Sequence, residues 1–178
     1  VIDDAMAFVG GIDFTVGRLD TRAHDPHDEG RREPGGGEIP QPHHDIQIAV
    51  SGEAARMLGD VARQRWEVAT GERLATPSST VDAAAVWPDG LEPDFTDLGV
   101  AIARSRPAWK NLAEIREVEA LYLSSISAAR NWIYIENQYL TSESIAEALA
   151  AHLRKTGGPE IVIILPREPS GWIEQTAM

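Results

Sequence analysis

The run from Glu160 to Leu165, EIVIIL, limits the fold more than any other feature of this chain. β-branched residues fill it, and a short continuous apolar run of this kind is typical of a strand in a parallel sheet. An earlier run, WIYIENQY from Trp132 to Tyr139, predicts a second strand that is buried on both faces. Between them, Thr141 or Ser142 can cap a helix that Gly157-Gly158-Pro159 stops. Because parallel strands need such a crossover, the sequence predicts a strand–helix–strand unit.

The preceding residues extend this alternation of strands and helices. Val100 to Ala103 (VAIA) predicts a short strand, and residues 112–130 predict a helix, because their apolar positions recur at helical spacing. From Gly171 the chain starts another helical pattern. The second half therefore has the rhythm of an α/β sheet built from crossover units.

The first half of the chain is less regular. Ala5 to Val9 predicts a strand that follows a tight turn at Asp3-Asp4, and Asp45 to Val50 (DIQIAV) alternates as a half-buried strand does. A helix is predicted from Gly52 to near Ala69. Residues 17–43 are rich in Gly, Pro and charged side chains, which predicts a long loop.

Three regions follow from this pattern. Residues 1–75 and residues 100–178 each carry strands and helices, whereas residues 76–99 show little periodicity and predict a connecting linker. The predicted fold class is α/β, with a mixed β-sheet flanked by helices.

Charge and composition exclude several classes of partner. The chain has 28 acidic and 16 basic side chains, a formal net charge of −12, and no cysteine. A nucleic-acid groove needs a basic face, so we expect no nucleic-acid partner, whereas a single phosphate needs only a few donors. Without cysteine there is no thiolate site, and the histidines lack a metal-ligand spacing, so we expect no metal and no cofactor. No apolar stretch is long enough to span a bilayer.

Asp3, Gly10, Gly11 and Asp13 are the first candidate site residues. A carboxylate at a strand end can orient an imidazole, and a glycine pair lets the backbone approach another group closely. Taken alone, however, two aspartates between two apolar runs predict a turn and nothing more.

The spacing of these residues resembles the first signature region of the phospholipase D superfamily. That motif is His-x-Lys, four residues and Asp, then six residues and Gly-Gly or Gly-Ser, one residue, and a polar Asn or Asp. In VIDDAMAFVGGIDFTVGRLDT, Asp3 matches the motif aspartate, Gly10 and Gly11 match the glycine pair, and Asp13 matches the polar position. In this register the histidine and lysine of the motif would fall before Val1.

Three further segments match the family in its order. PHHDIQIAVSGEAARMLGDVARQRW carries His44 and Asp45 before a strand and a helix, IYIENQYLTS carries Glu136, Asn137 and Gln138, and LPREPSGWIEQTAM fits bacterial members. The resemblance implies that the chain lies between the two histidine motifs. It also implies that residues 1–75 and 100–178 are parts of two phospholipase D-like α/β/α halves.

The resemblance implies hydrolysis or transphosphatidylation of a phospholipid, or of another phosphodiester, through a phospho-histidine intermediate. Asp3 would support the motif histidine, and Asp13 would act beside it. Substrate-binding roles would fall to Gly10, Gly11, His44, Glu136, Asn137 and Gln138. Because neither histidine motif is complete in the 178 residues, we expect the chain alone to be an inactive fragment. The whole protein from which it comes would be an active phosphodiesterase, and peripheral contact of that protein with a membrane is possible.

Other interpretations stay open. Glu136, Asn137 and Gln138 can satisfy loop backbone instead of substrate, and His44 beside Asp45 can be a structural hydrogen-bonded pair. The chain can also be a non-catalytic phospholipase D-like interaction module, a cardiolipin-synthase-like transferase, or a nuclease, which the acidic charge disfavours. The sequence leaves the compartment open between cytoplasm and membrane surface. It also leaves open the headgroup preference and the oligomeric state.

Overall fold

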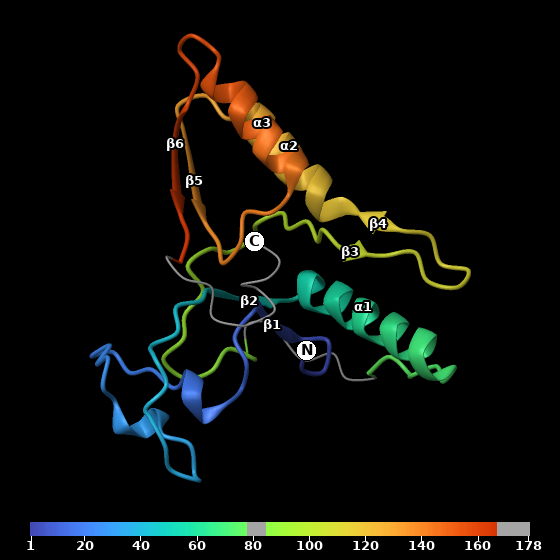
Figure 1. The fold of residues 1–178 in the computed structure, drawn as a ribbon. Helices are drawn as coiled ribbons and strands as arrows, with labels where there is room; N and C mark the ends of the chain where they lie inside the picture. Colours follow the sequence, from blue (N-terminus) through green and yellow to red (C-terminus); the bar gives the residue numbers. More distant parts are fainter. Residues whose placement is uncertain (78–84, 167–178) are drawn as a thin grey trace. The chain divides into compact units, whose positions relative to one another are not determined.

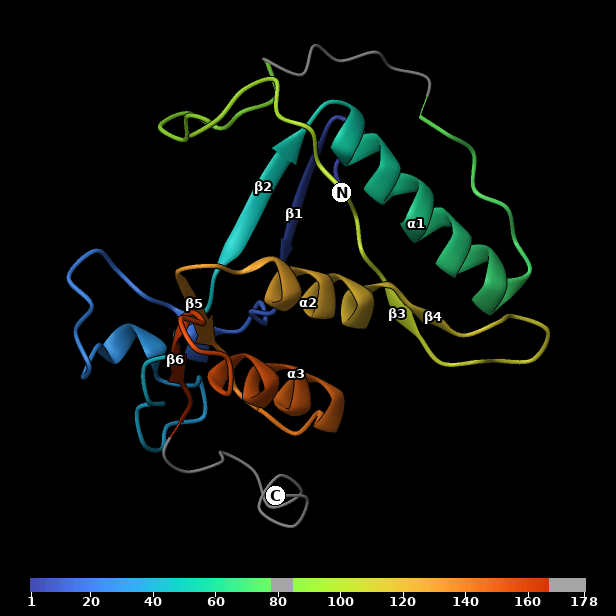
Figure 2. The same cartoon turned by 90° about the horizontal axis from the view of Figure 1, so that it is seen from above.

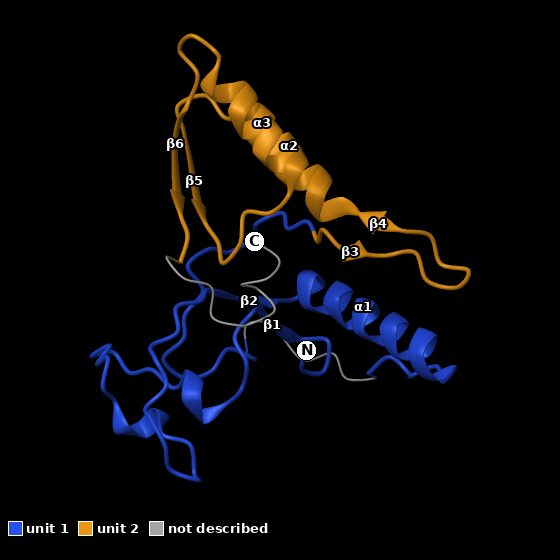
Figure 3. Cartoon of the chain, viewed as in Figure 1, with its two compact units in different colours: residues 1–101 blue, residues 102–178 orange. Residues whose placement is uncertain are grey.

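The chain divides into two compact units, Val1–Ala101 and Ile102–Met178 (Figure 3). The computed structural model describes residues 1–77 and 85–166, so the helical pattern predicted from Gly171 lies outside the described residues. Three two-stranded sheets, two antiparallel and one parallel, combine with three α-helices in the described part of the chain. The α/β class predicted from the sequence is confirmed. The assignment of residues 1–75 and 100–178 to two phospholipase D-like halves, joined by a linker at 76–99, stays a prediction.

Unit 1 is an antiparallel strand pair followed by one long helix (Figure 1). Its elements are β1 Met6–Gly10, the 3-10 helices η1 Val16–Arg18 and η2 Glu29–Arg31, β2 Gln47–Ser51 and α1 Glu53–Thr70. Ala7 of β1 and Ala55 of α1 are fully buried, and their small side chains let the helix pack closely against the strands. The helix ends at Gly71, whose left-handed φ of 78° suits glycine. Both predicted strands and the predicted helix are confirmed.

Unit 2 is a short hairpin followed by a strand–helix–strand crossover (Figures 1 and 2). Its elements are β3 Ser105–Arg106, β4 Ile115–Arg116, α2 Glu117–Ala128, β5 Trp132–Glu136, α3 Glu143–Leu153 and β6 Glu160–Ile164. β5 and β6 pair in parallel, with Trp132 opposite Glu160 and Glu136 opposite Ile164. The parallel crossover predicted from the sequence is therefore confirmed.

The hairpin that opens unit 2 differs from the prediction. Residues 100–103 form no strand, and pairing begins instead at Ser105. The helix begins at Glu117 and not near residue 112, because the chain first returns through β4. Arg104 fixes this start: its carbonyl accepts the Glu117 N–H at 2.9 Å, and its own N–H donates to the Glu117 carboxylate at 3.0 Å.

The core of unit 2 is small and lies on one face of the β5–β6 pair. Ile126 of α2 and Leu149 of α3 are buried, and the two helices lie side by side. On β5, Ile135 is half-buried while Trp132 and Tyr134 are exposed. The predicted burial of this strand on both faces is wrong for the described residues, because α2 and α3 cover one face.

No helix in residues 1–77 or 85–166 combines the length and the apolar composition that crossing a bilayer requires.

Candidate functional site

Asp3 and Asp4 form the tight turn that precedes β1. Both have positive φ angles, 48° and 57°, as the two central residues of a type I′ hairpin turn do. The Ile2 carbonyl accepts the Ala5 N–H at 2.9 Å, and the Ile2 N–H donates to the Met6 carbonyl at 2.7 Å. The predicted turn is confirmed, and the Asp3 side chain is exposed on it. Its role beside a motif histidine stays a prediction.

Asp4, which the sequence did not single out, is the aspartate that the fold uses here. Its two carboxylate oxygens accept hydrogen bonds from Arg63 of α1, at 2.9 Å from Nη1 and 2.7 Å from Nη2. Arg63 Nη2 also donates to Asp60 at 2.8 Å, which lowers the pKa of Asp60, while the two carboxylates raise the pKa of Arg63. Asp4 and Arg63 are 59 positions apart in the chain, so no local sequence pattern predicts that they pair.

Gly10 and Gly11 are glycines because side chains of the partner strand's end cover them. A Cβ on Gly10 would overlap Cγ of Gln47, its partner across the strand pair. A Cβ on Gly11 would lie 2.9 Å from a carboxylate oxygen of Asp45. The close approach predicted for the glycine pair is present, and within this chain the approaching groups are Gln47 and Asp45.

Asp3 and the glycine pair lie at opposite ends of β1. Asp3 precedes the strand and Gly10 ends it, and a strand of five residues spans about 16 Å. Because Gly10 pairs with Gln47, the end that holds Gly11 is also the end from which His44 enters β2. The structure thus brings Gly10, Gly11 and the His44 segment to one end of the strands, and leaves Asp3 at the other.

Asp13 and His44 are both exposed at this end of unit 1. The Asp13 carboxylate lies 3.8 Å from Nη2 of Arg18 in η1, with 71% of the Asp13 side chain accessible to solvent. An ion pair of that length at the surface contributes little to stability, which leaves the carboxylate available to other groups.

The loop at 17–43 is organised around one buried arginine. Arg31 is 1% exposed and donates hydrogen bonds to the carbonyl oxygens of Asp25, Pro26 and Pro40, at 2.8, 2.6 and 3.2 Å. At the surface of the same loop His24 contacts Asp20 at 2.6 Å, and this hydrogen bond lowers the pKa of Asp20. The loop was predicted, but its central Arg31 was not, since an arginine among many charged residues looks solvated in sequence.

Glu136, Asn137 and Gln138 lie at the carboxyl end of β5, where α/β folds place ligands. The Asn137 N–H donates to the Ile164 carbonyl of β6 at 3.1 Å, and the Asn137 side-chain oxygen accepts the Gln138 N–H at 2.8 Å. The Tyr134 hydroxyl donates to Glu136 at 3.2 Å. Burial of the hydroxyl, with the nearby Glu136 carboxylate, raises the pKa of Tyr134. These contacts use the Asn137 side-chain oxygen and not its amide nitrogen.

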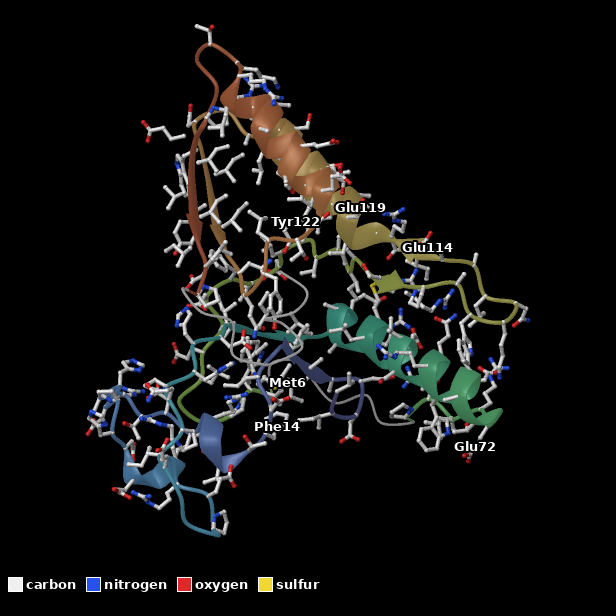
Figure 4. The ribbon with its side chains drawn as sticks, viewed as in Figure 1. Met6, Phe14, Glu72, Glu114, Glu119 and Tyr122 are labelled. Atoms are coloured by element: carbon white, nitrogen blue, oxygen red, sulfur yellow. The ribbon has the colours of Figure 1, made fainter. Side chains whose placement is uncertain are left out.

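Asn137 lines a pocket of about 580 Å³ within unit 2, which Glu136 and Gln138 do not line. Three kinds of polar side chain line the pocket. They are guanidiniums (Arg106 and Arg116), carboxylates (Glu114 and Glu119) and hydroxyls (Tyr122, Tyr139, Thr141 and Ser142). Figure 4 shows Glu119 and Tyr122 on α2, with Glu114 just before β4. The sequence predicted Asn137 as a site residue but not Arg106 or Arg116. These arginines lie in the β3–β4 hairpin, which the sequence did not predict.

The charges in this pocket are partly balanced. Glu119 lies 2.6 Å from Nε of Arg116 and accepts the Ser144 hydroxyl at 2.9 Å. Arg106 donates from Nη2 to the Ala113 carbonyl at 2.8 Å, and its buried Nε has no partner. The pocket therefore offers the N–H donors of Arg106 and an amide, beside an Arg116 guanidinium that two carboxylates approach, Glu119 at 2.6 Å and Glu114 at 4.0 Å. Guanidinium and amide N–H groups are donors suited to a small anion such as a phosphoryl group.

The candidate residues fall into the two units, with Asp3, Gly10, Gly11, Asp13 and His44 in unit 1 and Glu136, Asn137 and Gln138 in unit 2. Within the described ranges, no three His, Asp or Glu side chains are grouped so that they could hold a metal ion.

Comparison with known proteins gives one consistent result, although no family model matches the chain. The chain is 26% identical to phospholipase D A of Dictyostelium discoideum over 99% of its own length, and 30% identical to phospholipase D alpha 2 of Oryza sativa over 79%. It is 25% identical over 83% to phospholipase D1 of Schizosaccharomyces pombe. It spans 16%, 22% and 14% of the lengths of these relatives. Together with the matching Asp3–Gly10–Gly11 spacing and the Glu136-Asn137-Gln138 block, these similarities show that the chain belongs to the phospholipase D superfamily.

Proposed function

We propose that this chain forms part of a phosphodiesterase of phospholipase D type, which cleaves or transfers the headgroup ester of a phospholipid. The observation that carries the proposal is the pocket at the carboxyl end of β5, where Asn137 meets Arg106 and Arg116. A phosphodiester carries one negative charge and two non-bridging oxygens, and guanidinium and amide N–H groups are the donors that such oxygens accept. The relatives named phospholipase D support the same reaction class.

The proposed reaction needs two histidines that this chain does not supply. One imidazole nitrogen forms a bond to phosphorus while the ester bond to the leaving alcohol breaks, and the second histidine protonates that alcohol. Water or another alcohol, deprotonated by the second histidine, then breaks the phosphorus–nitrogen bond. No His-x-Lys occurs in the 178 residues, whose lysines are Lys110 and Lys155. The part assigned to Asn137, with Arg106 and Arg116, is to hold the phosphoryl oxygens.

The test compares the 178-residue chain with its parent protein on phosphatidylcholine vesicles. Choline release reports cleavage, and the appearance of phosphatidylglycerol when glycerol is added reports transfer. We expect turnover by the parent and none by the chain alone. Turnover by the chain at the parent's rate would contradict the need for outside histidines, and a parent inactive in both assays would favour the non-catalytic module.

A further inference from the structure

The β3–β4 hairpin ends in an exposed tip that the pocket does not use. Trp109 and Leu112 close the tip, since the Trp109 N–H donates to the Leu112 carbonyl at 3.1 Å and the Leu112 N–H donates to the Trp109 carbonyl at 2.9 Å. Lys110 and Asn111 are left as the two turn residues, and Lys110 has a positive φ of 51°. Within unit 2 the hairpin reaches away from β5, β6 and the two helices (Figures 1 and 2).

The tip pairs an aromatic side chain with a cation. Trp109 is 57% exposed, and the Lys110 ammonium lies 5.8 Å from the centroid of its ring. Pro107, Ala108 and Ala113 beside them are also exposed. An exposed indole flanked by small apolar residues and a lysine has the chemistry of side chains that sit at the headgroup level of a bilayer.

The hairpin is cationic although the chain is strongly acidic. The whole chain has 28 acidic and 16 basic side chains, but residues 104–116 hold one carboxylate and four cations. Two of the cations, Arg104 and Arg116, are paired with Glu117 and Glu119. Considering only the described residues, neither Arg106 nor Lys110 lies in an ion pair. Lys110 therefore supplies the unpaired positive charge at the tip, and Arg106 supplies the unpaired positive charge at the base of the hairpin.

The hairpin is also held in a defined shape next to the pocket. Arg106 of β3 donates from Nη2 to the Ala113 carbonyl just before β4, at 2.8 Å, which links the two strands across the loop. The base of the same hairpin, from Ser105 to Pro107 and from Glu114 to Arg116, lines the pocket that holds Asn137. A surface that binds the tip is thereby held near that pocket.

We propose that this tip is a contact for an anionic phospholipid surface, with Trp109 at the headgroup level and Lys110 against lipid phosphates. The choice of a phospholipid as the partner rests on the function proposed above. The contact can nevertheless be measured by binding alone, without catalytic turnover. A single-stranded or duplex nucleic acid fits less well, because it needs many cations along its backbone, and outside residues 104–116 the chain holds 27 acidic side chains (28 − 1) and 12 basic ones (16 − 4).

The test measures partition of the 178-residue chain onto vesicles of phosphatidylcholine and phosphatidylglycerol in equal parts, by sedimentation. We expect Lys110→Glu to weaken binding about thirtyfold, because each unit of charge near an anionic surface changes affinity about fivefold. Lys155→Glu makes the same change in the same unit away from the hairpin, and should leave binding unaltered. Trp109→Ala should weaken binding about tenfold through lost apolar contact, whereas Trp132→Ala, at a tryptophan on β5 that is 68% exposed, should not.

The outcomes distinguish lipid contact at the hairpin tip from nucleic-acid binding, and they test this contact separately from the proposed phosphodiesterase activity. Equal losses in Lys110→Glu and Lys155→Glu, or in the two tryptophan variants, would overturn it, provided that circular dichroism shows each variant folded. Binding to a polyanionic oligonucleotide without binding to vesicles would also overturn it. Hairpin-dependent vesicle binding by a chain whose parent lacks turnover would uphold the contact while the phosphodiesterase proposal fails.

Discussion

The Asp4 carboxylate and the Arg63 guanidinium are held together by two parallel hydrogen bonds of 2.9 and 2.7 Å. Their side chains are only 11% and 16% exposed, so this pair is more shielded than the other ion pairs in the described residues. It ties the turn before β1 to the middle of α1. The position of the turn that carries Asp3 therefore depends on a helix far along the chain.

Replacing Arg63 by lysine should lower the melting temperature of unit 1 by several degrees. A lysine ammonium is a point charge and cannot donate to both carboxylate oxygens in the planar geometry of a guanidinium. Arg63→Ala should lower it further, because Asp4 then keeps a shielded carboxylate without a partner. Thermal unfolding followed by circular dichroism measures both. Arg65→Lys, at an exposed position of α1, is the matched control, and an equal effect there would contradict the role of Arg63.

Gly59→Ala should destabilise unit 1 by about 1–3 kcal/mol, the usual cost of overpacking. A Cβ at this buried helix position would overlap the Asp4 carboxylate, which must then move away from Arg63. The effect should reverse in an Asp4→Ala background, where the obstacle is gone and alanine favours the helix by about 1 kcal/mol over glycine. Urea unfolding of the four proteins of this cycle tests the contact. Equal effects in both backgrounds would show that Asp4 is not the obstacle.

The sequence predicted elements well where local periodicity decides them. β5, α3 and β6 follow from an apolar strand, an amphipathic helix and a β-branched strand, each readable within a few residues. It failed at residues 100–116, where an apolar run at 100–103 looks like a strand but pairing falls at Ser105 and Ile115. That register is set by the contact between Arg104 and Glu117, which no local pattern encodes.

The candidate site shows the same limit. Asn137 could be identified because the polar block follows an apolar strand in sequence, and its place at a strand end was foreseeable. The pocket arginines Arg106 and Arg116 could not, since they reach Asn137 only through the hairpin. In unit 1, the sequence marked Asp3 as the important aspartate of the pair, while the fold anchors Asp4. What distinguishes Asp4 from its neighbour Asp3 is the long-range pairing of Asp4 with Arg63.

Acid should weaken unit 2 partly through Glu117. The hydrogen bond from the Arg104 side chain lowers the pKa of Glu117 in the folded chain below its ordinary 4.5. A carboxyl whose pKa is lowered by folding stabilises the fold above its unfolded pKa, and that contribution is lost as the pH falls through the folded value. Stability should thus fall below pH 4.5. Glu117→Gln should flatten this acid slope in urea unfolding at a series of pH values.

The control for this pH dependence is Glu147→Gln on α3, which makes the same change at an exposed carboxyl outside the ion pairs of the described residues. It should leave the acid slope of unit 2 as steep as in the unaltered chain. An equal flattening in both variants would mean that the slope arises from general charge rather than from the contact with Arg104.

Leu149→Ala should destabilise unit 2 by about 2–5 kcal/mol, because it leaves a cavity at a buried position between α3 and its neighbours. Leu149 is 4% exposed, whereas Leu153 one turn later on the same helix is 67% exposed. Leu153→Ala should therefore change stability by no more than about 0.5 kcal/mol. Urea unfolding measures both values. Comparable losses would mean that α3 packs through a different face.

In a parent protein with the proposed activity, Asn137→Ala should lower kcat/KM for phosphatidylcholine by about tenfold to a hundredfold, the effect of losing one hydrogen bond to a charged group. Asn137 lines the pocket beside Arg106, and its backbone N–H is held by Ile164, so the side-chain change should leave the strand pairing intact. Gln138→Ala is the matched control, because Gln138 is the next residue and does not line the pocket. Its effect should stay within about twofold. A loss in Gln138→Ala as large as in Asn137→Ala would place the substrate along the loop and not in the pocket. Unchanged activity in both variants would leave Asn137 with a purely structural role as acceptor of the Gln138 N–H.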